Sequence, residues 1–194
     1  MVSINRIAPK GKRLRAPRID FSTTKGLVEE FKNPSHNVRG AAFYGLKDKG
    51  AVTVPAVATL LSDDNKYVQA RAVFLLPHLG PKGVEFVEKR LEADDSQMRI
   101  AAFRSLRATG NNYISHAKAL AKDSSAAVRR EVALALRDIP FGKMKEILLD
   151  IVDGYDGIDR WYLEAVGTSV ALEEAKAYAY LKRKRGNNPA NWSK

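Results

Sequence analysis

The residues that could carry out chemistry in this sequence are few and scattered. The three histidines, His36, His78 and His116, do not show the four-residue spacing at which a helix presents two zinc ligands. The sequence contains no cysteine, which excludes thiolate metal sites, a cysteine nucleophile and covalent haem attachment within these residues. It also lacks a glycine-rich phosphate loop and a Gly-x-Ser-x-Gly motif. We therefore predict no catalytic, cofactor-binding or metal-binding residue in this chain.

Adjacent carboxylates are the next candidates, because paired acids can act as general acid and base. Asp63-Asp64 and Asp94-Asp95 are such pairs. Each lies in a turn just before an apolar, helix-periodic segment, where an acidic side chain accepts hydrogen bonds from the free N–H groups of the next helix. Turns that recur along one edge do not converge in a pocket. We interpret these pairs as helix caps.

The elements that position these residues repeat every thirty residues. Apolar anchors recur at one position, with a small or apolar residue four positions later and a leucine or valine eight positions later. The three sets are Val38, Val68, Met98, Val128 and Ile158; Ala42, Ala72, Ala102, Val132 and Tyr162; and Leu46, Leu76, Leu106, Leu136 and Val166. Spacings of four and eight place side chains on one face of a helix.

A second set of apolar residues with the same period precedes each of these helices. It begins at Leu27 and Phe31 and is separated from the next helix by turn residues such as Asn33-Pro34. Repeated pairs of helices bury a continuous core by stacking side by side. The sequence therefore predicts an all-α fold, an α-solenoid of about five helical hairpins.

An acidic residue five positions before the anchor and an arginine one position after it resemble the pattern of HEAT repeats. The matching residues are Asp63, Asp123 and Asp153 at the acidic position, and Arg39, Arg99 and Arg129 at the basic position. The resemblance covers roughly residues 24–180. It implies that these groups form a structural ladder of polar contacts between neighbouring repeats.

The fifth copy of the repeat is unusual, and its sequence is DGYDGIDRWYLEAVGTS. We place Ile158 at the anchor position, Tyr162 at the small-residue position and Val166 at the leucine position. Large aromatic residues here indicate either packing at the end of the array or a docking surface for another domain. The second helices of HEAT arrays usually line the concave face. We expect the candidate interaction surface there to comprise Arg104, Arg130, Arg160, Trp161 and Glu164.

A narrower resemblance rests on residues 159–165, Asp-Arg-Trp-Tyr-Leu-Glu-Ala, and on two stretches near the start, INRIAPKG and APRIDFSTTKGLVEEF. These are similar to the HEAT segment of multidomain bacterial dehydrogenases, which follows a sugar-dehydrogenase-like propeller and precedes a cytochrome c module. The resemblance implies a parent protein with a quinone cofactor and haem c, neither of which this chain would bind. The chain would then be a fragment that acts as a spacer between the two redox domains.

The net charge of +11 is located mainly at the two ends of the sequence. Six of the 33 basic residues and one acid lie in residues 1–20, and five basic residues and no acid lie in residues 181–194, which leaves 22 basic and 21 acidic residues between them. We predict a basic extended linker at 1–22, a solenoid at 23–181 and a basic tail at 182–194. The resemblance implies that the linker includes the remnant of a propeller strand.

Two other functions remain open. The first is nucleic-acid binding, in which arginines on the second helices and Trp161 would contact the nucleic acid. Alkylpurine DNA glycosylases share this architecture. The nearly neutral charge of the body argues against this function. A free-standing protein-binding scaffold is the other. We expect a non-enzymatic monomer whose partners are proteins or neighbouring domains, without a membrane span. No signal peptide opens the sequence, whereas the resembled family works outside the cytoplasm, so the location stays open.

Overall fold

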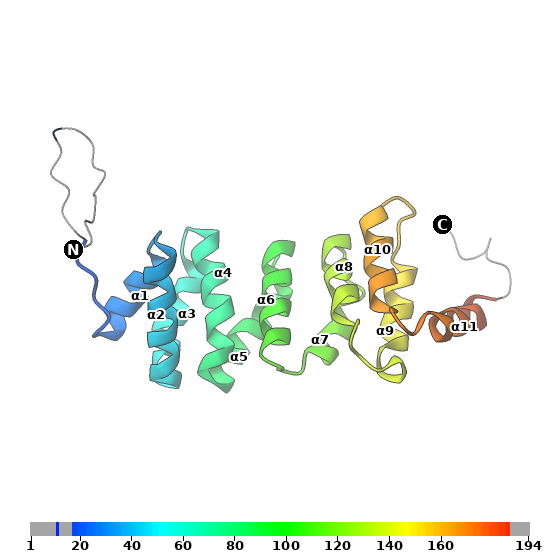
Figure 1. Cartoon of the computed structure of the whole chain (residues 1–194), viewed down its shortest axis with the longest axis horizontal. Coiled ribbons are helices and arrows are strands. Elements are labelled where there is room, and N and C mark those ends of the chain that lie inside the picture. Colours follow the sequence, from blue (N-terminus) through cyan, green and yellow to red (C-terminus); the bar gives the residue numbers. More distant parts are fainter. Residues whose placement is uncertain (1–10, 12–16, 187–194) are drawn as a thin grey trace, which may run out of the picture. The chain divides into compact units, whose positions relative to one another are not determined.

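The computed structural model describes residue 11 and residues 17–186. Every regular element within these residues is a helix (Figure 1). The chain divides into two compact units, Met1–Asp48 and Lys49–Lys194. The predicted all-α solenoid of helical hairpins is confirmed.

The first unit contains one hairpin, made of α1 (Thr24–Lys32) and α2 (His36–Lys49), whose last residue belongs to the second unit. The Thr23 hydroxyl caps α1 by accepting the Gly26 N–H at 2.9 Å. The rings of Phe31 and Phe43 pack with their centroids 6.2 Å apart. The two helices therefore share an apolar contact, as the repeat predicts.

The second unit contains four further hairpins and a terminal helix. Its first hairpin consists of η1 (Gly50–Thr53), α3 (Val54–Ala58) and η2 (Thr59–Ser62), followed by α4 (Lys66–Leu75) and η3 (Leu76–Leu79). The next hairpin pairs α5 (Pro81–Glu88) and η4 (Lys89–Glu92) with α6 (Ser96–Ala108). A third hairpin pairs α7 (Tyr113–Leu120) with α8 (Ala126–Ala135). A fourth pairs α9 (Phe141–Asp153) with α10 (Arg160–Ser169). The terminal helix is α11 (Glu174–Arg185). Helices α4, α6, α8 and α10 pack in that order (Figure 1).

Short polar side chains start the second helices of these hairpins. The carboxylates of Asp95 and Asp159 accept the backbone N–H two residues later, each at 2.9 Å, and the Asn65 side chain does the same at the start of α4. Asp63 accepts the N–H of Asn65, also at 2.9 Å, and so orders the turn before α4. These contacts satisfy donors that a helix start leaves free. The interpretation as a helix cap is confirmed for Asp95, whereas α4 is capped by Asn65 and not by the Asp63-Asp64 pair.

The core of the second unit follows the predicted columns through its first three hairpins. The buried members are Val68, Ala72, Leu76, Ala102, Leu106, Val128, Val132 and Leu136. Met98 departs from the pattern, because it is only half-buried while Ile100 and Phe103 fill the space beside it. Hydrophobic burial along these columns stabilises the stack.

The fifth copy of the repeat is displaced by four residues, which corrects the predicted alignment. In the preceding hairpin Ser125 precedes α8 and Val128 is the buried anchor; here Asp159 precedes α10, and Tyr162 lies at the anchor position. Ile158, predicted as the anchor, is 86% exposed. The extra length comes from α9, which continues to Asp153, and from the six-residue loop at 154–159.

The loop at 154–159 has its own backbone requirements. Gly157 adopts a φ of 85°, in the left-handed region that favours glycine. The Asp156 carboxylate accepts the N–H groups of Ile158 and Asp159 at 2.9 and 3.1 Å. These hydrogen bonds lower the pKa of Asp156, most strongly the one from Ile158. The displacement also moves Val166 to the small-residue position and Val170 to the leucine position.

The chain ends outside the repeats extend beyond what the structure describes. The resemblance of residues 4–11 to a propeller strand falls outside the described residues except for residue 11, and so do residues 187–194 of the predicted basic tail. Helix α11 ends at Arg185, so Lys182 to Arg185 form its last turn. Among the described residues, no helix combines the length and the apolar character that crossing a membrane would require.

Candidate interaction surface

One contact between repeats joins α6 to the turn before α8. The Arg99 Nε and Nη2 groups donate to the two Asp123 carboxylate oxygens at 2.8 and 2.7 Å. Both side chains are largely buried. Burial opposes the charge of Asp123, but the hydrogen bonds from Arg99 and from the Ser125 N–H, with the nearby guanidinium charges, lower its pKa overall. These two residues of the predicted ladder are therefore brought together.

Arg129 continues this line of contacts toward the last hairpin. Its Nη1 donates to the Asp123 carbonyl at 2.6 Å, and its Nη2 donates to the Gly154 carbonyl at 2.7 Å. Its Nε donates to the Tyr162 hydroxyl at 3.3 Å, and that hydroxyl donates to the Ile151 carbonyl at 2.7 Å. Burial raises the pKa of Tyr162, so the phenol remains a neutral donor at physiological pH.

The predicted ladder residues Arg39 and Asp153 make contacts other than a carboxylate–arginine pair between neighbouring repeats. Arg39 Nη1 donates to the Pro34 carbonyl at 2.7 Å. Asp153 forms an ion pair with Arg185 at the end of α11. Asp153 is the last residue of α9, so it lies in a helix where the ladder pattern would place a turn residue. The carbonyl of Gly154 takes the contact with Arg129 that we predicted for Asp153.

A second line of ion pairs links successive second helices. Arg104 of α6 donates to the carboxylate of Glu131 of α8 at 2.5 Å, and this hydrogen bond raises the pKa of Arg104. Arg130 of α8 pairs with Asp159, the cap of α10, at 3.1 Å. Lys66 pairs with Asp95, the cap of α6, also at 3.1 Å. These pairs fix neighbouring helices and hold two of the predicted surface arginines in place.

A shallow groove of about 340 Å³ lies between α8 and α10. Its lining consists of Arg130, Leu134, Trp161, Glu164, Ala165 and Thr168. The groove thus contains three of the predicted surface residues. A fourth, Arg160, lies on the same helix and pairs with Glu164 at 3.5 Å, while Arg104 lies one helix away on α6.

Apolar surface is exposed along this groove. Trp161 is 70% exposed and Leu134 is 37% exposed. A large aromatic side chain held open beside an arginine is the typical composition of a protein-binding hot spot. Sequence analysis missed Leu134 and Thr168, because both follow from the actual start of α10 and its packing on α8. The cap signal at Asp159, two residues before Trp161, could have revealed that start.

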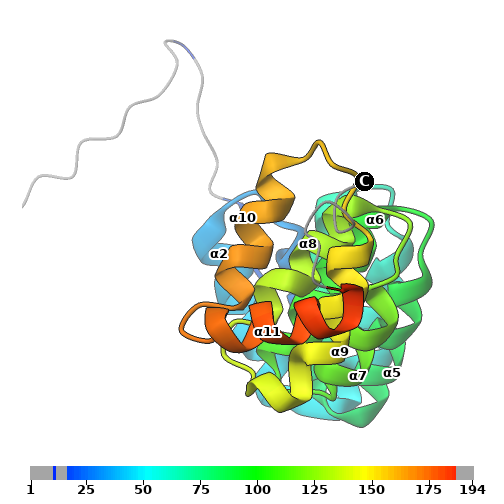
Figure 2. The same cartoon turned by 90° about the vertical axis from the view of Figure 1, so that its right-hand side faces the viewer.

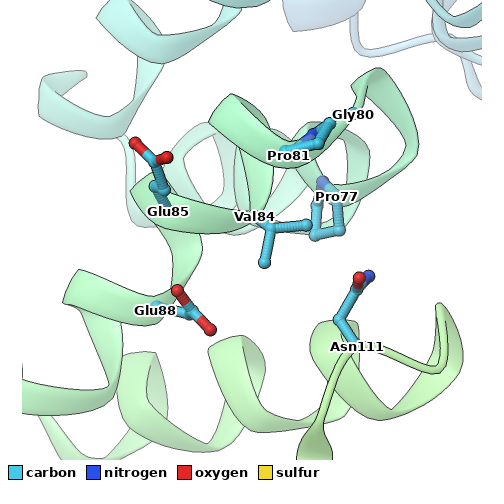
Figure 3. A pocket seen from close by; sticks show the side chains of 7 residues that line it. All are labelled: Pro77, Gly80, Pro81, Val84, Glu85, Glu88 and Asn111. Atoms are coloured by element: carbon cyan, nitrogen blue, oxygen red, sulfur yellow. The ribbon is translucent and has the colours of Figure 1, made fainter.

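Another hollow, of about 380 Å³, lies beside α5 (Figure 3). It is lined by Pro77, Gly80, Pro81, Val84, Glu85, Glu88 and Asn111. Figure 3 shows Glu88 and Asn111 on opposite sides of it. Glu88 lies 3.1 Å from His116 Nε2. Within residues 11 and 17–186, no group of three histidine or acidic side chains is arranged to hold a metal ion.

The sequence from 53 to 137 matches the family model of HEAT repeats. This part of the chain is similar to HEAT repeats. The HEAT match runs from the end of η1 through α8, and so includes Arg99, Asp123 and Arg129 but not α10. The HEAT-repeat arrangement explains why successive helices are joined by polar contacts at one edge and apolar contacts in the core.

Two solved structures resemble this chain. One is the crystal structure of an engineered protein from the Northeast Structural Genomics Consortium, with a TM-score of 0.44 and 18% identity over 78% of this chain and 79% of that one. The other is the complex of CpcE and CpcF of phycocyanin lyase from Nostoc sp. PCC7120, with a TM-score of 0.36 and 17% identity over 77% of this chain and 67% of that one. No curated protein matches the sequence.

Proposed function

We propose that this chain is a non-catalytic HEAT-repeat scaffold that binds another protein through the groove between α8 and α10. The observation that carries the proposal is Trp161, which is 70% exposed at the edge of a groove that also contains Leu134 and Arg130. An exposed tryptophan gains binding energy when a partner removes it from water.

The ion pairs beside the groove support the same proposal. Arg130 is held by Asp159 and is therefore ordered before a partner arrives. An ordered arginine loses less conformational freedom on binding than a free one. Glu164 and Arg160 offer one charge of each sign at the rim. The partner surface that fits is an apolar centre flanked by polar groups of both signs.

A comparative enrichment experiment tests this function. The tagged full chain and its Trp161→Ala variant are used to recover proteins from source cells, and Tyr178→Ala serves as the matched control because Tyr178 is also an exposed aromatic residue, on α11. We expect one protein to be depleted only by Trp161→Ala. Removal of a central aromatic anchor costs about 2 kcal/mol or more, which is roughly 30-fold in Kd. Equal recovery with all three proteins would contradict the proposal.

We further propose that the bound partner is a neighbouring domain of a larger dehydrogenase-like protein. Four residues of the motif at 159–165, namely Arg160, Trp161, Leu163 and Glu164, are exposed on α10. In the resembled family this segment lies between a propeller and a cytochrome c module. Quinone and haem would then bind in those neighbouring domains, and the scaffold would hold donor and acceptor at a fixed separation.

The DNA that flanks the coding sequence tests this narrower proposal. A frame for a propeller upstream and a Cys-x-x-Cys-His motif downstream are the expected findings. Unrelated genes on both sides would contradict the dehydrogenase setting, but they would leave the binding role of the groove intact. The two proposals can therefore fail separately.

A further inference from the structure

Positive charge is concentrated where α11 packs against α9, at the C-terminal end of the second unit (Figure 2). Three cations approach one aromatic ring there. The Nζ atoms of Lys145 and Lys184 lie 5.9 and 5.7 Å from the centre of the Tyr180 ring, and Arg183 Cζ lies 5.6 Å from it. Lys118 of α7 joins them, because its charge acts on the same carboxylate, Glu146. We call Lys118, Lys145, Arg183 and Lys184 the cationic cluster.

The charge of the cationic cluster is only partly balanced by the described residues. Lys118, Lys145 and Lys184 act on the carboxylate of Glu146, and Arg183 lies at the same Tyr180 ring, so four positive charges and one negative charge give a local charge of +3. The neighbouring acids do not change this balance: Asp150 pairs with Lys122 at 3.4 Å, and Asp153 pairs with Arg185. Arg183 and Lys184 belong to the basic end of the sequence, whereas Lys118 and Lys145 belong to the near-neutral range 21–180, so only the fold brings the four charges together.

Tyr180 forms the base of the cationic cluster. It is only 4% exposed, and its ring packs edge-on against Phe141 with the centroids 6.0 Å apart. Its buried hydroxyl makes no hydrogen bond of good geometry, although Glu146 lies close enough to act on it. Burial, followed by this carboxylate, raises the pKa of Tyr180 to about 12. The phenol is thus neutral and adds no negative charge to the cluster.

The helix dipole explains only part of this arrangement. Cations in the last turn of α11, such as Arg183 and Lys184, interact favourably with the carbonyl end of that helix. Lys118 and Lys145 belong to α7 and α9, so the α11 dipole does not account for them. Like charges held this close repel one another in the absence of an anion. A bound polyanion removes that repulsion.

We propose that the cationic cluster binds the phosphate backbone of nucleic acid without reading its base sequence. Nucleic acid has one phosphate charge per roughly 1.7 Å of duplex, so it can place several phosphates against one cluster. The Arg183 guanidinium supplies a planar donor fork suited to phosphate oxygens. This site is separate from the groove at Trp161, and the proposal goes beyond the protein-binding role.

The exposed side chains argue for nucleic acid over an anionic membrane. Peripheral membrane binding combines basic residues with an apolar face that enters the lipid. Among the described residues of α7, α9 and α11, Tyr178 is the one exposed large hydrophobic side chain, at 53%, and Leu172 is exposed just before α11. Two separate apolar side chains do not make the continuous apolar face of a membrane-binding helix.

Binding of a short labelled DNA duplex, measured over a series of salt concentrations, tests the proposal with the full chain. The cluster variant carries Lys145→Ala, Arg183→Ala and Lys184→Ala. The control carries Lys25→Ala, Lys47→Ala and Lys82→Ala, which remove the same charge from exposed positions elsewhere. Each lost phosphate contact reduces the log–log salt slope by about 0.9, so the cluster variant should lose about 2.7 units of slope. The control should lose far less.

Two further measurements keep the outcome unambiguous. A variant with Lys145→Arg, Arg183→Lys and Lys184→Arg keeps the charges and should bind DNA as the parent chain does, while thermal melting checks that all variants fold. Equal losses in the cluster variant and the control would overturn the proposal, because binding would then follow total charge. Binding to phosphatidylserine vesicles that depends on the cluster, without such dependence for DNA, would also overturn it in favour of a membrane.

Discussion

Arg99 and Asp123 are joined by two hydrogen bonds of 2.8 and 2.7 Å across 24 residues of sequence. Arg99 also donates to the carbonyls of Ala93 and Asp94 at 2.7 and 2.9 Å. One side chain thus connects the turn before its own helix to the turn before the next one. This contact holds α6 to the turn before α8.

Removal of either member of this pair should destabilise the protein. Loss of one partner from a buried ion pair costs about 3–5 kcal/mol, because the other charge stays buried without compensation. We expect a cost of this size from Arg99→Ala and from Asp123→Ala in urea denaturation. The double variant should cost less than the sum of the two single variants. Additive costs would show that the two residues are not coupled.

The stability that Asp123 contributes should depend on pH. Its pKa is lowered in the folded protein from an unfolded value of 3.8, so the folded state favours the carboxylate. Its contribution is therefore complete above the unfolded pKa and is lost as the pH falls through the folded pKa. The difference in unfolding free energy between the unsubstituted chain and Asp123→Asn should be largest near neutral pH and should shrink below about pH 4. A difference that is constant with pH would contradict this account.

The displaced alignment of the last repeat predicts different losses of stability for substitutions at Tyr162 and at Ile158. Tyr162→Ala should cost about 3–5 kcal/mol, because it removes a fully buried ring and leaves a cavity. Ile158→Ala should change stability by no more than about 0.5 kcal/mol, because the side chain lies in solvent. Chemical denaturation of both variants distinguishes the two. A large loss of stability in Ile158→Ala would contradict the displacement, because Ile158 would then be the buried anchor.

Gly83 should not tolerate a side chain, although it lies in a helix where alanine is normally favoured. A Cβ atom at this position would come within 1.9 Å of the Leu76 carbonyl oxygen, which is backbone and cannot rotate away. We expect Gly83→Ala to lower the melting temperature markedly. Gly142→Ala is the control, because a Cβ there meets no atom within 4 Å. Similar melting temperatures would show that α5 and η3 can separate without cost.

The sequence predicts the hairpins well because a thirty-residue period in apolar residues translates directly into buried helix faces. It predicts the Arg99 and Asp123 positions because charge and spacing recur with the anchors. The anchor of the last repeat was predicted wrongly, because Ile158 is apolar and lies thirty residues after Val128. Four extra residues in α9 and its loop move the true anchor to Tyr162, and the cap at Asp159 was the available signal.

The surface features depend on tertiary contacts that spacing does not encode. The groove residue Leu134 becomes relevant only once α10 packs on α8. The cationic cluster combines α7, α9 and α11, whose lysines and arginines are distant in sequence. Summation of charge by sequence range divided the cluster, because Lys118 and Lys145 were counted with the near-neutral body and Arg183 and Lys184 with the basic C-terminal end.

Site-specific photocrosslinking tests the central claim most directly. A photoreactive aromatic amino acid, which keeps a large aromatic ring at the position, replaces Trp161 in the groove or, as the control, Val52, which is 78% exposed on η1. After irradiation in source cells, we predict one discrete crosslinked protein from position 161, none from position 52, and loss of the product when Arg130→Ala is added. The same products from both positions, or none from position 161, would contradict the assignment of the α8–α10 groove as a protein-binding surface.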